Sequence, residues 1–139
     1  MNIYFACSIT GGREFEPVYQ VLMEALLADG HEIPTFHLAD STVVDLEDRV
    51  SPREVFDRDV SWIAAADILI AEVSVPSHGV GYEIGHALGL GKPVLCLAQH
   101  GRKVSKMITG NPHPGLLMQT YADERGAVRL ARDFIAAHS

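Results

Sequence analysis

Short apolar runs alternate along this chain with longer segments in which apolar residues recur every three or four positions. The short runs are rich in β-branched and aromatic residues and predict five strands, at residues 2–8, 31–38, 67–73, 92–98 and 116–121. The longer segments have the spacing of one helix face and predict four helices, at residues 16–30, 51–67, about 80–90 and 123–138. The chain is therefore expected to consist of repeated strand–helix units.

Local signals at the ends support two of these helices. Gly30 follows the first helical segment and is a natural C-cap. The second segment opens with Ser51 as N-cap and Pro52 at the first helical position, and Glu54 completes a capping box. Residues 39–50 are rich in acidic side chains and show no firm period, so we expect a mobile loop or lid there.

The alternation predicts an α/β fold: a single doubly wound (flavodoxin- or Rossmann-like) parallel five-stranded sheet with helices on both faces. Residues 1–139 are expected to form one domain, a length that supports its own core. Ligands of such sheets bind outside the carboxyl ends of the strands, near the switch in strand order. Functional side chains are therefore expected at residues 8–13, from residue 37 onward and at residues 74–83.

Charge and composition narrow the range of partners. The chain has 11 Lys and Arg against 18 Asp and Glu, a net charge of −7, which argues against nucleic acid because phosphate backbones need clustered cations. No apolar run approaches the roughly 20 residues that span a bilayer, and the N-terminus lacks the pattern of a signal peptide. Cys7 and Cys96 lie in apolar runs without a CxxC pair, which is typical of reduced thiols in a cytoplasmic protein. His78 and His86 lack a metal-ligand spacing, so we assign no metal and no cofactor.

The loop SITGGR, residues 8–13, follows the first predicted strand. It offers the hydroxyls of Ser8 and Thr10, the backbone N–H groups around Gly11 and the guanidinium of Arg13. Such a set of donors suits a monophosphate. Glycine-rich loops after a first strand also serve as purely structural turns, and the pattern alone leaves that alternative open.

The segment GVGYEIG, residues 79–85, follows the strand at 67–73 and resembles an anion-binding turn that opens a helix. Ser77 adds a further donor, but the turn is followed by Glu83 rather than by a Lys, Ser or Thr. The positive end of the helix is expected to lower the pKa of Glu83. An ionised carboxylate at a ligand cleft suits a nucleophile, and the alternative is a surface residue that complements the helix dipole.

A second carboxylate precedes this segment. Asp59 lies near the edge of an apolar helix face, and Asp57 and Asp59 point about 200° apart on a helix, so at most one of them faces a given cleft. Two carboxylates around one sugar are the usual equipment for cleaving a glycosidic bond. His37, after the second predicted strand, falls at the same cleft edge, either as a contact to base or phosphate or as an exposed loop residue.

Four segments together, IYFACSITGGRE, DRDVSWIAAADILIAEVS, PSHGVGYEIGHA and SKMITG, resemble the 2′-deoxynucleoside 5′-phosphate N-hydrolases of the nucleoside 2-deoxyribosyltransferase superfamily. The resemblance runs from about residue 3 to residue 110. It implies cleavage of the N-glycosidic bond of deoxynucleoside monophosphates, with release of the free base and 2-deoxyribose 5-phosphate. It implies a small-molecule nucleotide substrate and no cofactor.

The resemblance also implies roles for single residues. Glu83 becomes the nucleophile that attacks the anomeric carbon, Asp59 positions the sugar and handles the proton, and Tyr4 lies beside the reacting sugar. Ser105 resembles a serine that the family lends to the neighbouring subunit, which implies a homodimer. The full set of substrate- and phosphate-binding positions implied is Phe5, Ala6, Cys7, Ser8, Ile9, Thr10, Gly11, Arg13, Tyr19, His37, Ser77, Gly79, Ser105, Lys106 and Met107.

Two positions depart from the family loop, which usually reads GSIRGGR. Here Cys7 replaces a Gly and Thr10 replaces an Arg, which removes a charged phosphate donor typically worth about 1.5–3 kcal/mol. A strict dependence on the 5′-phosphate therefore does not follow from the resemblance. Base exchange by a nucleoside deoxyribosyltransferase and a nucleotide-binding module without turnover remain as alternatives.

Overall fold

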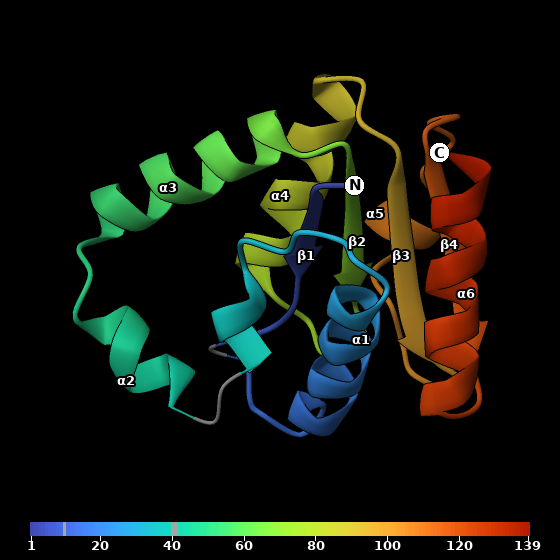
Figure 1. The fold of residues 1–139 in the computed structure, drawn as a ribbon, viewed down its shortest axis with the longest axis horizontal. Coiled ribbons are helices and arrows are strands. Elements are labelled where there is room, and N and C mark those ends of the chain that lie inside the picture. Colours follow the sequence, from blue (N-terminus) through green and yellow to red (C-terminus); the bar gives the residue numbers. More distant parts are fainter. Residues whose placement is uncertain (10, 40–41) are drawn as a thin grey trace.

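A computed structural model describes residues 1–9, 11–39 and 42–139. Helices and strands alternate along most of the chain (Figure 1). The elements are β1 (Ile3–Ala6), α1 (Glu16–Ala28), the 3₁₀ helix η1 (Phe36–Ala39), α2 (Val43–Asp48), α3 (Pro52–Ala65), β2 (Ile68–Glu72), α4 (His78–Gly89), β3 (Val94–Gln99), α5 (Lys106–Thr109), β4 (Leu116–Tyr121) and α6 (Glu124–Ala137). The predicted α/β class and the four predicted helices are confirmed. The region 39–50, expected to be a mobile loop or lid, contains the helix α2, whereas η1 lies mostly in the segment predicted as the second strand.

Within the described residues, the sheet contains four parallel strands in the order β1-β2-β3-β4. The prediction of a fifth strand at residues 31–38 is wrong, because this segment makes only an isolated parallel bridge between Asn2 and Glu32. Beyond the bridge, Pro34 offers no backbone N–H for a ladder. The hydroxyl of Thr35 takes over the pairing: it accepts from the Phe5 N–H at 3.2 Å and donates to the Phe5 carbonyl at 2.8 Å.

Helices cover both faces of the sheet. Residues that alternate along each strand divide between two apolar clusters, as the pleat requires. Ile3 and Phe5 of β1 belong to the cluster with α1 and α6, whereas Tyr4 and Ala6 belong to the cluster with α3 and α4. Figure 1 shows α1 beside α6, with α2 and α3 at the other end of the molecule.

The path of the chain creates the switch point that such sheets use for ligands. After β1 the chain runs through α1 and returns to bridge one edge of β1 at Glu32. It then crosses through α3 to β2, which pairs with the opposite edge of β1. Connections therefore leave β1 in two directions, and the loops beyond the carboxyl ends of β1 and β2 border a crevice.

Candidate active site

A cavity of about 750 Å³ lies beside the switch point and contains both carboxylates singled out in the sequence. Asp59 of α3 and Glu83 of α4 face it from two helices, and Glu47 and Asp48 of α2 border it. The complete lining is Ile9, Glu47, Asp48, Val50, Pro52, Val55, Phe56, Asp59, Val60, Ile63, His78, Gly79, Tyr82 and Glu83. The arrangement brings acid–base groups together in a largely apolar pocket, as a small-molecule site requires.

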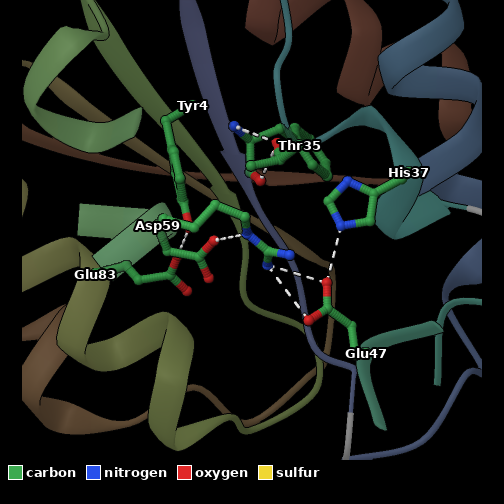
Figure 2. Close-up of polar contacts among 8 residues, drawn as sticks. Tyr4, Thr35, His37, Glu47, Asp59 and Glu83 are labelled. Atoms are coloured by element: carbon green, nitrogen blue, oxygen red, sulfur yellow. Dashed lines mark hydrogen bonds and ion pairs between the residues drawn. The ribbon is translucent and has the colours of Figure 1, made fainter. Parts of the chain in front are cut away.

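Tyr4 reaches this group of carboxylates from β1 of the sheet. Its alternation in β1 points the side chain toward α4, where it is fully buried, and its hydroxyl donates a hydrogen bond to Glu83 Oε2 (Figure 2). Burial raises the pKa of the Tyr4 phenol far above its usual range, and the charges of Glu83 and Asp59 raise it further. The phenol therefore stays protonated and acts as a fixed donor.

The expected lowering of the Glu83 pKa is wrong. The pKa of Glu83 is raised to about 7: burial is the largest cause and the Asp59 charge adds to it, whereas the Tyr4 hydrogen bond and Arg58 oppose the rise. Helix α4 begins at His78, so Glu83 lies in the second turn, whereas the field of a helix end falls off within the first. Desolvation therefore dominates, and near neutral pH the carboxyl is divided between its two forms.

The Asp59 carboxylate is held by its neighbour Arg58. Arg58 Nε donates to Asp59 Oδ1 at 2.8 Å. Burial raises the pKa of Asp59 above its ordinary value, and the hydrogen bond and charge of Arg58 oppose this. Asp57 instead pairs with Arg53 at 2.8 Å on the exposed side of α3, so the prediction that at most one of Asp57 and Asp59 faces the cleft is confirmed.

Two charged residues of this site were missed by the sequence analysis. Arg58 Nη2 donates to both carboxylate oxygens of Glu47, at 3.0 and 3.3 Å, and His37 Nε2 lies 2.8 Å from Glu47 Oε1. The guanidinium also lies 4.8 Å from the centre of the Trp62 ring. The DRD triplet that contains Arg58 was a usable signal, but residues 39–50 have no period that would identify Glu47.

His37 contacts the site through Glu47 rather than by lining the cavity. Its ring also meets the Trp62 ring edge-on, with centroids 6.0 Å apart. His37 therefore lies next to a residue that borders the cavity, and its predicted contact with substrate stays a prediction.

The glycine loop after β1 is folded onto the loop after β2. The Gly11 N–H donates to Ser8 Oγ at 3.2 Å, and Arg13 Nη1 donates to the Ser8 carbonyl at 3.1 Å. A Cβ on Gly11 would lie 2.6 Å from Ser8 Oγ and 2.7 Å from the Pro76 carbonyl oxygen, so the close approach requires glycine. Thr10 lies outside the described residues.

The predicted phosphate and substrate positions around β1 and the start of α4 lie in three kinds of surroundings. Ile9 and Gly79 line the cavity with Glu83. Ser77 caps α4 by accepting from the Val80 N–H at 3.3 Å. The other positions near β1 are buried among core side chains instead of lining the described cavity: Phe5, Ala6, Cys7, Ser8 and Tyr19.

Two of these buried positions have distinctive polar groups. Burial raises the pKa of the Cys7 thiol to about 12, so the thiol stays protonated. The Tyr19 ring packs edge-on against Phe5 with centroids 6.4 Å apart, and within the described part of the chain its hydroxyl has no hydrogen-bond partner.

Ser105, Lys106 and Met107 lie away from Glu83 of their own chain. They line a second cavity, of about 970 Å³, together with Ser77 and the opposite side of α4. Ser105 caps α5 by accepting from the Met107 N–H at 3.2 Å, and Met107 is 83% exposed. Helix α4 therefore separates these residues from the carboxylates.

Residues 1–9, 11–39 and 42–139 contain no group of three or more His, Cys, Asp or Glu side chains placed to hold a metal ion. None of their helices combines the length and the apolar character needed to cross a bilayer.

Known proteins are similar to this chain in sequence and in architecture. The family model described as Nucleoside 2-deoxyribosyltransferase matches residues 3–126. The chain is 38% identical to "Putative 2'-deoxynucleoside 5'-phosphate N-hydrolase 1" of Methanosarcina mazei over 136 residues, which cover 98% of this chain and 84% of that protein. It is 40% identical to the 5-hydroxymethyl-dUMP N-hydrolase of Mus musculus over 141 residues, covering 97% and 80% of the two chains.

A solved structure agrees at the level of the fold. The CMP N-glycosidase of Clostridium botulinum matches with a TM-score of 0.70 and 21% identity, over 95% of this chain and 98% of that one. The chain therefore belongs to the nucleoside 2-deoxyribosyltransferase family and, within it, to the 2′-deoxynucleoside 5′-phosphate N-hydrolases.

Proposed function

We propose that this protein hydrolyses the N-glycosidic bond of 2′-deoxynucleoside 5′-monophosphates, giving the free base and 2-deoxyribose 5-phosphate. The observation that carries the proposal is the group formed by Tyr4, Asp59 and Glu83, two carboxyls at one cavity with a buried phenol hydrogen-bonded to one of them. The names of the relatives support the same substrate class.

The reaction proceeds in two displacements on the same carbon. Glu83, ionised, attacks the anomeric carbon; a C–O ester bond forms, the C–N bond breaks, and the base leaves with the electron pair and accepts a proton from Asp59. Water then attacks the anomeric carbon and the ester bond breaks, which returns the carboxylate of Glu83. Asp59 takes the proton of that water and is ready for the next cycle. Tyr4 fixes the attacking carboxyl by its hydrogen bond.

The phosphate is held where the two loops meet. Arg13 and the N–H groups near Gly11 come from the loop after β1, and Ser77 and the start of α4 from the loop after β2. Because Thr10 stands where the family has an arginine, we propose that the phosphate contributes less to binding here than in relatives with that arginine.

The assembly we propose is a homodimer in which Ser105 completes the neighbouring site. The position of Ser105 supports this, because α4 separates it from the carboxylates of its own chain. We place the enzyme in the cytoplasm, which suits the two buried, unpaired thiols of Cys7 and Cys96.

Base release measured by chromatography tests the function. The wild type and Glu83→Gln are offered dGMP, dCMP, dTMP, GMP and deoxyguanosine. We expect release from the deoxynucleoside monophosphates by the wild type and a loss of at least about 1,000-fold in the variant, since no nucleophile remains. Binding of monophosphates without release by the wild type would contradict hydrolysis and favour a binding module.

Base exchange is the second candidate, because the matching family model carries the name of a deoxyribosyltransferase. It shares the attack by Glu83 but resolves the ester with a second base in place of water. Deoxyguanosine supplied with free adenine separates the two reactions: formation of deoxyadenosine without net hydrolysis would establish the transferase.

A further inference from the structure

Arg58 joins two consecutive helices of the chain, α2 and α3. Its Nε donates to Asp59 Oδ1 at 2.8 Å, and its Nη2 donates to Glu47 Oε1 at 3.0 Å. Asp59 faces the cavity from α3, whereas Glu47 belongs to α2 on another wall. The guanidinium thus spans from the helix of the site carboxylate to the helix that borders the cavity.

We propose that Arg58 is a positioning residue for Asp59, and that Glu47 holds Arg58 in place so that the packing of α2 sets the orientation of the Asp59 carboxylate. This inference rests on the proposed function, in which Asp59 handles the proton. It assigns to α2 a part in catalysis although none of its residues reacts.

The geometry favours an arginine at this place. A guanidinium is planar and offers donors in a fixed fork, so the two carboxylates that it binds are held at a defined angle. Its plane is held in turn by the Trp62 ring, 4.8 Å from the guanidinium carbon. The side chains of Arg58, Asp59 and Glu47 are 25%, 23% and 13% exposed, so solvent screens these ion pairs less than it would at an open surface.

Arg58 also acts on the protonation of the site. Asp59 faces Arg58, Glu47 and His37, and Glu83 faces Tyr4, Asp59 and Arg58. Of these groups, Arg58 lowers the pKa of both carboxyls. Removal of the Arg58 charge therefore raises both pKa values and moves the acid limb of the pH–rate profile to higher pH. Replacement of a residue that only stabilises the fold would leave the acid limb where it is.

Four variants test the proposal: Arg58→Met, Arg58→Lys, Glu47→Gln and the control Arg53→Met. The control removes the same charge from α3, at an ion pair whose side chains are 84% and 56% exposed. For Arg58→Met we expect kcat to fall about 100-fold with KM changed far less, and the acid limb to rise by about one pH unit. Arg58→Lys keeps the limb near its wild-type position but loses kcat, because the fork is absent. Glu47→Gln gives a smaller loss of kcat.

The control is expected to match the wild type in kcat, KM and pH profile. If Arg58→Met has the kcat and pH profile of Arg53→Met, the inference is wrong while the proposed function stands. A thermal unfolding curve for each variant verifies that the comparison is between folded proteins.

A second readout does not depend on turnover. The Asp59 carboxyl is titrated by ¹³C NMR in the wild type, in Arg58→Met and in Arg53→Met. We expect its pKa to rise in Arg58→Met alone, by about one unit or more. An unchanged pKa would overturn the role of Arg58, and this holds whether or not the wild type releases base, so the two proposals fail separately.

Discussion

At the scale of single residues, the protonation of Glu83 depends on the side chains that surround it. Burial is the main cause of its raised pKa, and the hydrogen bond from Tyr4 is the largest opposing influence. A carboxyl with a pKa of about 7 ionises over the range in which the enzyme is expected to work. The attacking form therefore grows as the pH rises through neutrality.

Tyr4→Phe tests this coupling. The variant loses the hydrogen bond that lowers the Glu83 pKa, so that pKa rises and the ionised fraction at neutral pH falls. We expect the acid limb of kcat/KM to move to higher pH by about one unit, as read from a pH–rate profile. Tyr121→Phe is the matched control, because the Tyr121 hydroxyl contacts Glu72 and not the site. A limb that stays in place in Tyr4→Phe would show that the phenol does not control the nucleophile.

Glu83 also links pH to stability. Its pKa is about 7 in the folded chain against an ordinary value of 4.5, so between these values the folded state binds the extra proton. Stability from this group therefore falls as the pH rises through that window, and above it the buried charge is a net cost. We expect Glu83→Gln to have a higher Tm than the wild type at about pH 8, with the difference shrinking toward about pH 4. A pH-independent difference in Tm between the two proteins would contradict this.

At the scale of elements, the loops after β1 and β2 meet through one glycine. Gly11→Ala forces a methyl group against the Pro76 carbonyl and Ser8 Oγ. We expect the loops to separate and KM for deoxynucleoside monophosphates to rise about tenfold, a loss of about 1.4 kcal/mol in binding. Initial-rate kinetics measure this, with Gly89→Ala in α4 as control, where a methyl group meets nothing within 4 Å. Equal KM values in the two variants would show that the close approach of the two loops does not contribute to substrate binding.

The sequence predicted those helices whose caps and apolar spacing are set by neighbouring residues. The cap of α3 by Ser51, which accepts from the Glu54 N–H at 3.2 Å, and the apolar periods of α1 and α6 are properties of consecutive residues. The expected fifth strand failed for a tertiary reason. A side-chain hydroxyl of Thr35 replaces the ladder along β1, and an apolar run of this length carries no sign of that replacement.

Some residues of the candidate site could likewise be predicted from short motifs, and others could not. Glu83 and Asp59 stand in short motifs that resemble those of the family, so the sequence made them candidates, and the structure brings both to one cavity. Glu47 and Arg58 are 11 residues apart on separate helices, α2 and α3, and no periodicity encodes the contact between their side chains. The pKa of Glu83 also escaped prediction, since burial is decided by residues from separate elements.

At the scale of the whole molecule, α4 forms a wall of two cavities, one with Glu83 and the other with Ser105. If Ser105 serves the neighbouring subunit, two inactive variants complement each other. A Glu83→Gln chain mixed with a Ser105→Ala chain yields mixed dimers in which one site has both residues intact. We expect recovery of about a quarter of the wild-type activity from random pairing of equal amounts.

The mixing experiment is read as base release per total enzyme, before and after the chains are denatured and refolded together. Wild-type chain diluted into Glu83→Gln is the control for refolding yield. Activity that never exceeds that of Ser105→Ala alone would show that Ser105 does not act across an interface.

Tyr4 is a fully buried member of the cluster formed with α3 and α4, and it is also the donor to Glu83. Substitutions at this position must therefore preserve both the packing of the core and the hydrogen bond to Glu83. In a survey that measures cellular abundance and turnover, Tyr4→Phe is expected to keep a high abundance but a low turnover. Small polar replacements are expected to lower both abundance and turnover. Stabilising changes made elsewhere will restore abundance to Tyr4 variants without restoring their chemistry.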